Sequence, residues 1–287
     1  MFTKSMKLIA LCLTAFLLTA ANEPAAARTL DQIVSSGELR VGYIVTPPNV
    51  IRDPATGDLT GFDIDAIKEI ANMMGLKSTK FIETTWGTFA AGLQADQFDV
   101  SIAGTFATVK RSMAVQFTRT IYSAGWGAVV LKTNTRIKSL ADMNTSDTRI
   151  AVVQGGSAED YVRRNMPKAQ LVTLATGDLT AGLVEVVAGR ADVGIEDFFT
   201  VNNFVKQQPS IKNLYYDHPF NFTPIAWAVS KGNLDLVNVI NTGINVLTLS
   251  GRYDDMARAY FKAGDLPVGY IETPHLEGFP RAVPGGE

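Results

Sequence analysis

Phe98-Asp99-Val100-Ser101-Ile102 and Ala191-Asp192-Val193-Gly194-Ile195 are near copies of each other, and they decide how this sequence is organised. Each follows a segment with helical spacing of apolar residues and then a polar turn, at residues 94–97 and 189–190. Each copy is a short apolar run, which is typical of a buried strand. The repeat predicts two α/β lobes of similar plan. The alternative, that any two buried parallel strands look this similar, stays open.

Predicted strands and helices alternate around both copies, which is the pattern of an open α/β sheet. Around the first copy we predict strands at 39–43, 81–83 and 98–103, and helices at 63–74 and 89–94. Around the second we predict strands at 149–153, 171–174 and 192–195, and helices at 158–165 and 179–188. A last helical region spans 234–261 and is broken at Ser250-Gly251.

Two extended stretches are expected to connect the lobes. Residues 122–131 are rich in Gly and Val and are long for a loop, and residues 225–229 form a second β-like run. Two crossings between the same lobes would make a hinge. Residues 265–287 hold several prolines and glycines, and we expect them to form an extended surface tail.

Composition excludes several classes of function. The 287 residues hold 26 Lys and Arg against 28 Asp and Glu, scattered along the chain, so the basic patch of a nucleic-acid-binding protein is absent. One cysteine excludes a disulfide framework and a cysteine-rich metal site. The two histidines, His218 and His275, leave little material for a metal centre. We therefore expect no metal and no cofactor.

The first 27 residues have the pattern of a secretory signal. Lys4 and Lys7 precede an apolar run at residues 8–20, which leads to the small residues Ala25-Ala26-Ala27. The run is short of the ~20 residues that a membrane-spanning helix needs. We predict cleavage after Ala27, which removes the cysteine, Cys12, and exports the rest of the chain.

Opposite charges follow the two repeated strands. In open α/β sheets, ligands bind beyond the carboxyl ends of the strands. Gly104, Thr105 and then Arg111 follow the first copy, and Asp197 follows the second. Arg111 can bind a carboxylate through two hydrogen bonds, with backbone N–H groups of Gly104 and Thr105 beside it, and Asp197 can accept hydrogen bonds from an ammonium group. The pattern predicts a site for a zwitterion, unless Arg111 and Asp197 are ordinary surface residues or form salt bridges with their neighbours.

Most of the remaining aromatic and acidic residues have structural explanations. Core or hinge packing explains four aromatic residues better than ligand contact does: Trp126, Trp227, Phe198 and Phe199. Asp63 stands at the predicted start of a helix, where aspartate is a favoured N-cap.

The chain resembles the periplasmic solute-binding proteins of polar amino-acid ABC transporters, solute-binding family 3, over residues 30–261. The resemblance rests on the order and spacing of Leu39-Arg40-Val41-Gly42, Gly61-Phe62-Asp63-Ile64-Asp65, Trp86, Phe98-Asp99-Val100, Thr108 with Arg111, and Gly189-Arg190-Ala191-Asp192. It implies a periplasmic-binding-protein-like α/β fold of type II, with two lobes joined by a two-strand hinge. Lobe 1 would hold residues 28–123 and 227–264, and lobe 2 would hold 124–226 with the hinge crossings.

The resemblance also implies roles for single residues. Arg111 matches the arginine that binds the ligand α-carboxylate, and Asp197 matches the aspartate that binds its α-ammonium group. Ser157, with Gly156 before it, matches the Ser or Thr that also holds the carboxylate.

The wall around the ligand side chain departs from the family pattern. Gly104 and Phe106 fall where the family makes backbone and hydroxyl contacts, but Phe106 replaces a Ser or Thr. Thr46 stands where an aromatic residue is usual. We hypothesise that Phe106 and Trp86 supply the aromatic surface, and that the ligand is an unusual one such as an opine or a small cyclic amino acid rather than a standard basic amino acid.

The favoured function is capture of an amino acid or a derivative in the periplasm, by a monomer that delivers it to an inner-membrane ABC permease. Lobe closure around the ligand would be the mechanism. One alternative is an enzyme on the same scaffold, similar to cyclohexadienyl dehydratase, which needs an acid or base in the cleft. A second is a ligand-presenting partner of a sensor.

Overall fold

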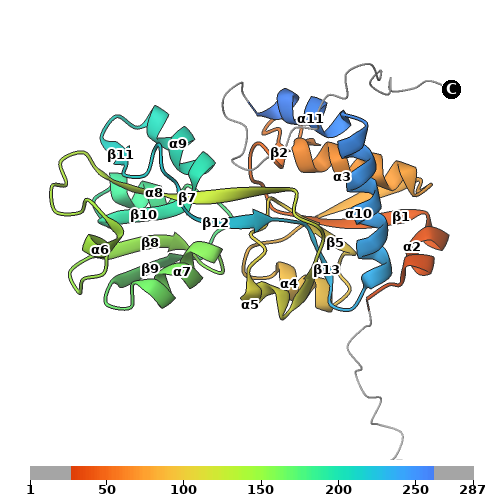
Figure 1. Cartoon of the computed structure of the whole chain (residues 1–287), viewed down its shortest axis with the longest axis horizontal. Coiled ribbons are helices and arrows are strands. Elements are labelled where there is room, and N and C mark those ends of the chain that lie inside the picture. The colour runs from red at the N-terminus through yellow and green to blue at the C-terminus, as the bar shows by residue number, and fades with distance from the viewer. Residues whose placement is uncertain (1–26, 262–287) are drawn as a thin grey trace, which may run out of the picture.

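The computed structural model of the chain describes residues 27–261. The predicted signal up to residue 26 and the predicted tail at 265–287 lie outside the described residues, and so do Cys12 and His275. Figure 1 shows two α/β lobes side by side, joined by strands that run between them.

Lobe 1 is built on a five-stranded sheet in the order β4-β1-β5-β13-β6. Its parallel part comprises β1 (Glu38–Tyr43), β4 (Ser78–Glu83) and β5 (Val100–Ile102). β13 (Ala228–Ser230) runs antiparallel to both of its neighbours, β5 and β6 (Val115–Phe117). The helices of this lobe are α2 (Leu30–Ser36), α3 (Phe62–Met73), α4 (Phe89–Gln94), α5 (Val109–Ser112), α10 (Leu234–Leu249) and α11 (Arg252–Tyr260). A short hairpin pairs β2 (Ile51–Arg52) with β3 (Leu59–Thr60).

Lobe 2 is built on a second sheet in the order β11-β7-β10-β8-β9, with β12 also paired to β7. Its strands are β7 (Tyr122–Leu131), β8 (Arg149–Val153), β9 (Gln170–Leu174), β10 (Val193–Asp197), β11 (Ile211–Asn213) and β12 (Phe220–Ile225). Its helices are α6 (Leu140–Met143), α7 (Ser157–Asn165), α8 (Ala181–Val187) and α9 (Phe198–Gln207).

Two segments cross between the sheets. Residues 118–121 lead from β6 to β7, and Ala226-Trp227 leads from β12 back to β13 (Figure 1). The two crossings are hydrogen-bonded to each other: the Thr118 N–H donates to the Trp227 carbonyl (2.9 Å) and the Ile121 N–H to the Ile225 carbonyl (2.8 Å). The β-like run expected at 225–229 does cross between the sheets, as two buried strand ends: Ile225 belongs to β12, and Ala228 and Val229 belong to β13. Composition alone does not show where one strand ends and the next begins.

The two copies found in the sequence occupy equivalent places. β5 lies parallel to β1 in lobe 1, and β10 lies parallel to β8 in lobe 2. In each lobe the aspartate of the copy accepts a hydrogen bond from the backbone N–H of an arginine on the neighbouring strand. Asp99 Oδ2 lies 2.7 Å from the Arg40 nitrogen, and Asp192 Oδ2 lies 2.8 Å from the Arg149 nitrogen. The repeat is thus a structural one, which decides against chance similarity of two strands.

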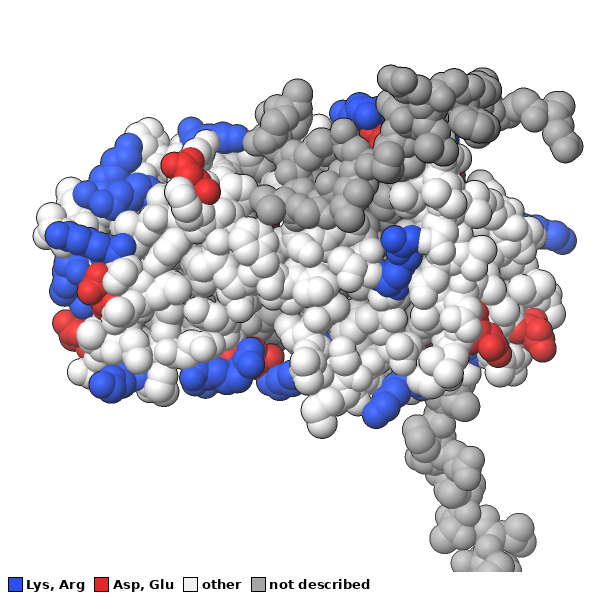
Figure 2. All heavy atoms as spheres, viewed as in Figure 1, with Lys and Arg blue, Asp and Glu red and all other residues white. Residues whose placement is uncertain are grey.

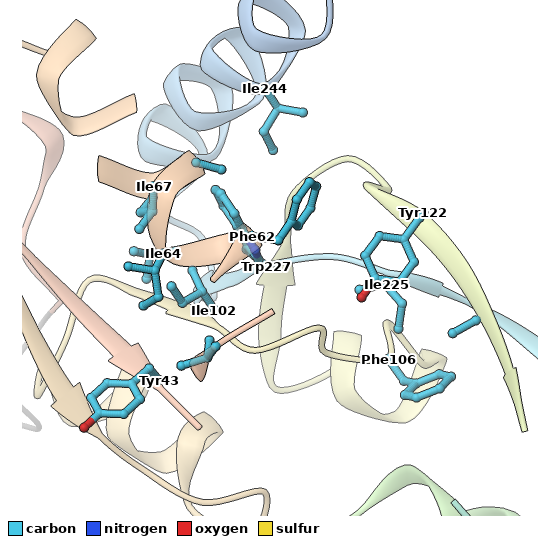
Figure 3. Close-up of a cluster of buried hydrophobic side chains, with 14 of the residues drawn as sticks. Tyr43, Phe62, Ile64, Ile67, Ile102, Phe106, Tyr122, Ile225, Trp227 and Ile244 are labelled. Atoms are coloured by element: carbon cyan, nitrogen blue, oxygen red, sulfur yellow. The ribbon is translucent and has the colours of Figure 1, made fainter. Parts of the chain in front are cut away.

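The core of lobe 1 lies between its sheet and helices α3, α10 and α11. Apolar residues at helical spacing on α3, including Ile64, Ile67 and Ile70, are buried against it. Figure 3 shows Phe62 and Trp227 at the centre of this cluster, with Tyr122, Ile225 and Phe106 extending it toward lobe 2.

Asp63 does not cap α3, contrary to the expectation. Gly61 is the N-cap residue, with φ of 123° and no side-chain cap. A Cβ atom on Gly61 would stand 2.4 Å from the Asn49 carbonyl oxygen, so the chain enters the helix too close to the 46–50 loop for another residue. Asp63 is instead buried, 1% exposed, with a different partner described below.

Charged groups are spread over the surface. Figure 2 shows Lys and Arg in small groups, with Asp and Glu between them, on the face that it presents. Within residues 27–261, no helix is long and apolar enough to cross a membrane, and no cluster of three metal-binding side chains occurs.

Candidate functional site

A cavity lies between the lobes, at the ends of β1, β5 and β10, beside the hinge crossings. Its walls include Thr46 and Asn49 after β1, Gly104 and Phe106 after β5, Tyr122 at the start of β7, and Asp197 at the end of β10. The cavity leaves about 40 Å³ for the centre of a water-sized sphere. One water molecule needs roughly 10–15 Å³ on that measure, so the space suits a small ligand.

Arg111 is the cation of the cavity. The Thr108 hydroxyl accepts a hydrogen bond from the Arg111 N–H (3.2 Å) and caps α5, which carries Arg111 toward lobe 2. The guanidinium donates to the carbonyl oxygens of Phe106 and Gly155, each at 3.1 Å, and its carbon lies 5.5 Å from the ring centre of Trp86. Burial lowers the pKa of Arg111 to about 10, so the group is charged at neutral pH.

No carboxylate within residues 27–261 forms an ion pair with Arg111. Its two side-chain hydrogen bonds go to carbonyl oxygens, and its ring contacts are with Trp86 and Phe89. A half-buried cation whose hydrogen-bond partners are carbonyl oxygens suits a carboxylate ligand, which would supply an opposite charge in direct contact.

Asp197 faces the cavity from lobe 2 and is also the N-cap of α9. Its Oδ1 accepts hydrogen bonds from the backbone N–H groups of Phe199 and Thr200, both at 3.0 Å. Burial raises the pKa of Asp197. An ammonium group in the cavity would offset that burial, because an opposite charge favours the ionised carboxylate.

Glu196 also lines the cavity and was not among the predicted site residues. It is 8% exposed, and its Oε1 accepts a hydrogen bond from the Asp197 N–H (3.0 Å). Burial, together with the charge of Asp197, raises the pKa of Glu196 to about 8. In a regular strand, the adjacent side chains of Glu196 and Asp197 would point to opposite faces of the sheet. Here the chain turns from β10 into α9 at this point, and both carboxylates line the cavity.

The N-terminus of α7 closes the lobe 2 side of the cavity. Gly156 is its N-cap residue, Ser157 is its first residue and is 9% exposed, and both line the cavity. The first N–H groups of a helix have no partner within the helix and carry partial positive charge, which favours an anion there. Ser157 and Arg111 therefore present positive potential from opposite lobes.

The Gly104 N–H is not the free backbone donor that was expected. The Gly104 N–H donates to Asp63 Oδ2 (3.0 Å), so the buried Asp63 carboxylate holds the backbone of the loop after β5. Gly104 still lines the cavity, where its φ of 62° and the nearby Asn49 amide exclude a side chain. Thr105 is 1% exposed and is not among the lining residues.

The aromatic wall contains the two predicted residues and two more. Phe106 and Trp86 line the cavity, and Phe106 packs edge-on against Trp126 with ring centres 5.8 Å apart. Phe199 and Tyr122 line it as well, and Phe199 also packs against Phe198 and Phe261, with ring centres 5.7 and 6.0 Å apart.

Packing does explain the other three aromatic residues of that group. Trp126 and Trp227 are buried in the core cluster, and Phe198 is not among the lining residues. Sequence spacing does not show that Phe199 reaches the cavity, because the turn after Asp197 decides which side of α9 faces it.

Thr46 and Asn49 form the part of the wall where an aromatic residue was missing. The Thr46 hydroxyl donates to the Ala103 carbonyl (3.2 Å), and Asn49 Oδ1 accepts from the Tyr122 hydroxyl (3.0 Å). Tyr122 thus takes its place in the wall from the hinge strand rather than from the loop after β1.

The two lobes touch at the mouth of the cavity. A Cβ atom on Gly155 would stand 2.6 Å from the Cα of Gly87 in lobe 1. On the same side, Lys110 Nζ lies 2.5 Å from Asp160 Oδ1 across the cleft. The structure is therefore a closed arrangement of the lobes.

Comparison with known proteins matches this architecture. The family described as bacterial extracellular solute-binding proteins, family 3, matches residues 39–263. A probable amino-acid ABC transporter-binding protein of Haemophilus influenzae is 29% identical, over 80% of this chain and 87% of that protein. The cyclohexadienyl dehydratase of Pseudomonas aeruginosa is 24% identical, over 75% of this chain and 80% of the enzyme.

The crystal structure of an ancestral amino acid-binding protein, a precursor of cyclohexadienyl dehydratase, is also similar. It is 31% identical with a TM-score of 0.71, and the match covers 81% of this chain and 98% of that one. The structural neighbours have the two-lobed, type II architecture that the fold shows.

Proposed function

The chain belongs to the bacterial extracellular solute-binding proteins of family 3, and we propose that it binds an amino acid or a derivative as a zwitterion between its lobes and presents it to an ABC permease. Relatives named as amino-acid ABC transporter-binding proteins support this function. The permease and a monomeric state are parts of the proposal that rest on the family.

The observation that carries the proposal is the placement of opposite charges on opposite lobes. Arg111 on lobe 1 and Asp197 on lobe 2 line one cavity, and the N-terminus of α7 stands beside them. A ligand carboxylate would bind Arg111 and the Ser157 end of α7, and the ligand ammonium group would bind Asp197. Such a ligand has more contacts in the closed state than in the open one, so its binding energy drives closure.

The moving parts in this proposal are lobe 1 (residues 28–123 and 227–264) and lobe 2 (residues 124–226). Residues 118–121 and 226–227 would act as the hinge, because few residues there must change their backbone angles. Aromatic side chains from both lobes, Phe106 and Trp86 with Phe199, would contact the ligand's side chain.

Native mass spectrometry of the protein isolated from its own periplasm tests this function. We expect a co-purified ligand with a mass of an amino acid or an amino-acid derivative such as an opine. A thermal-shift panel of amino acids and opines then ranks candidates. Tight binding of a ligand that lacks either a carboxylate or an amine would contradict the zwitterion site.

We place the protein in the periplasm, as several relatives are named periplasmic, and we infer signal cleavage between Ala27 and Arg28. The Arg28 backbone nitrogen lies 3.2 Å from Asp96 Oδ1, and its Nε lies 3.0 Å from Asp99 Oδ1. Cleavage at that bond would turn the nitrogen into an ammonium group and the hydrogen bond into an ion pair. The intact mass of the exported protein should correspond to a chain that begins at Arg28; another first residue would contradict this site.

An enzyme similar to cyclohexadienyl dehydratase is the second candidate, and Glu196 is the observation that favours it. A buried carboxyl group in a cleft, with its pKa raised to about 8, is suited to general acid catalysis. Incubation of the purified protein with prephenate or arogenate tests this activity. Turnover that Glu196→Gln abolishes would establish it, and absence of turnover would leave binding as the function.

A further inference from the structure

One of the two carboxyl oxygens of Glu196 is free to bind a group in the cavity. Its Oε1 accepts from the Asp197 N–H, and within residues 27–261 its Oε2 has no hydrogen-bond partner. The side chain is nevertheless buried among cavity residues. Burial without a partner is costly for an ionised carboxylate, so this oxygen is placed for a group that the ligand supplies.

When the ligand is bound as proposed, no cation among the described residues of the cavity lining remains to pair with Glu196. Arg111, Glu196 and Asp197 are the residues with formal charge among those that line it. In the proposed function, a zwitterion pairs its carboxylate with Arg111 and its ammonium group with Asp197. Glu196 then meets the ligand either as an ionised group facing a second cation or as a neutral acid.

The neighbouring carboxylate favours the neutral acid. Glu196 and Asp197 are adjacent in the chain and both line the cavity, and two carboxylates that share one site disfavour each other's ionisation. Within residues 27–261, Arg111 is the one cation among the lining residues, and the ligand carboxylate would pair with it. The rings of Phe106, Trp86 and Phe199 line the same cavity.

We propose that Glu196 is a specificity-determining residue that meets the ligand as a neutral carboxylic acid and donates a hydrogen bond from Oε2 to a ligand oxygen. The site then selects small amino acids of zero net charge and disfavours those with a cationic side chain. This inference rests on the proposed function and adds the charge of the ligand to it.

The pKa of about 8 agrees with this assignment, since Glu196 is then mostly protonated at pH 7. Asp197, beside it on the same strand, opposes ionisation, and Arg111 from α5 favours it more weakly than burial opposes it. Tyr122 of β7 is the remaining titratable group of the lining. Asp63 on α3 and Asp160 on α7 are not among the lining residues.

Isothermal titration calorimetry from pH 6.5 to 9 tests the proposal, with L-alanine, L-serine, L-glutamine, L-lysine and L-arginine as probes. If binding needs the neutral acid, affinity is constant below pH 8 and falls by up to about tenfold per pH unit above it. Measurements at pH 8.5 in buffers of different ionisation enthalpy should show uptake of about three-quarters of a proton by Glu196, the fraction ionised half a unit above a pKa of about 8. At pH 7 a neutral probe should bind at least about tenfold more tightly than lysine or arginine.

Glu196→Gln, the amide equivalent of the neutral acid, is the matched variant. It should keep the affinity for the neutral probe at pH 7 within about threefold and remove the decline above pH 8 that depends on Glu196. Any decline left in Glu196→Gln belongs to the ligand's own ammonium group. Glu185→Gln, a Glu-to-Gln change elsewhere in lobe 2, should behave as the wild type does.

Two results would overturn the proposal while leaving amino-acid binding intact. One is a wild-type pH profile and proton count identical to those of Glu196→Gln. The other is tighter binding of lysine or arginine by the wild type, reversed in Glu196→Gln. If no amino acid or opine binds and none co-purifies, the proposed function itself is wrong, and this inference with it.

Discussion

At the scale of single residues, the site depends on the half-buried guanidinium of Arg111, which within residues 27–261 has carbonyl and ring partners but no ion pair with a carboxylate. Arg111 donates to the carbonyl oxygens of Phe106 and Gly155 and lies between the rings of Trp86 and Phe89. These contacts fix its orientation without neutralising it. The cost of burying its charge is offset when an anion binds, so Arg111 contributes to ligand affinity more than to stability.

We predict that Arg111→Ala weakens amino-acid binding roughly hundredfold or more, because removing one partner of a buried ion pair costs about 3–5 kcal/mol. The stability of the ligand-free protein should change little. Titration calorimetry measures the first effect and urea unfolding the second. Lys168→Ala, at an exposed lysine of lobe 2 that does not line the cavity, is the control and should change affinity by less than about threefold.

Phe106→Ser restores the small hydroxyl residue expected at this position and removes the ring that packs on Trp126. We expect the order of ligand preference to change, because the ring forms part of the wall. A thermal-shift panel of amino acids and opines measures that order. An unchanged order would show that Phe106 has no part in selectivity.

At the scale of secondary-structure elements, each lobe repeats an arginine–aspartate contact between neighbouring parallel strands, but the two contacts differ in burial. The Asp99 side chain is 1% exposed and bonded to both Arg28 and Arg40, whereas the Asp192 side chain is 21% exposed and bonded to Arg149. Burial alone would raise the pKa of Asp99, but hydrogen bonds from the two arginines outweigh it and hold the pKa below its ordinary value.

We therefore predict that Asp99→Asn lowers the free energy of unfolding by about 3 kcal/mol, and Asp192→Asn by about 1 kcal/mol. A lowered pKa means that this stability is present above the pKa of the unfolded chain, near 3.9, and is lost as pH falls through the folded value. Both variants should be less stable than the wild type at neutral pH, and the difference should shrink in acid as the wild type loses this contribution. Urea unfolding at pH 7 and pH 3 measures this; equal losses at both pH values would contradict it.

At the scale of the whole molecule, each lobe is built on its own sheet, and short crossing segments connect the two lobes. Two crossings join the sheets, and on the far side the lobes meet through Gly155, packed on Gly87, and through Lys110 and Asp160. The close contact requires glycine at position 155, where φ is 74°. A substitution at Gly155 therefore tests whether the lobes close in this way.

Gly155→Ala should weaken ligand binding at least tenfold, because its Cβ atom collides with backbone atoms of the other lobe. Gly189→Ala is the matched control: it has a similar φ of 70° but nothing within 4 Å of its Cβ position. Both variants should lose about 1 kcal/mol of stability from backbone strain. Equal affinities in the two variants would exclude closure at Gly155.

The sequence by itself determined the alternation of strands and helices around the two repeated strands, and the two charges at the strand ends. Apolar spacing placed α4 and β8 at their observed bounds, the Gly- and Val-rich stretch at 122–131 is β7, and the rule for strand ends brought Arg111 and Asp197 to one cavity. These features depend on local periodicity and on one topological rule, both of which can be recognised in a single sequence.

The tertiary structure alone decided which partners those residues have. The run at 225–229 divides between two sheets, the Gly104 N–H is bonded to Asp63, and Glu196 enters the cavity beside Asp197. Each outcome depends on contacts between segments far apart in the chain, or on a turn that ends strand alternation. Sequence spacing predicted that charges would gather at the cleft, and only packing decided which of them a ligand can reach.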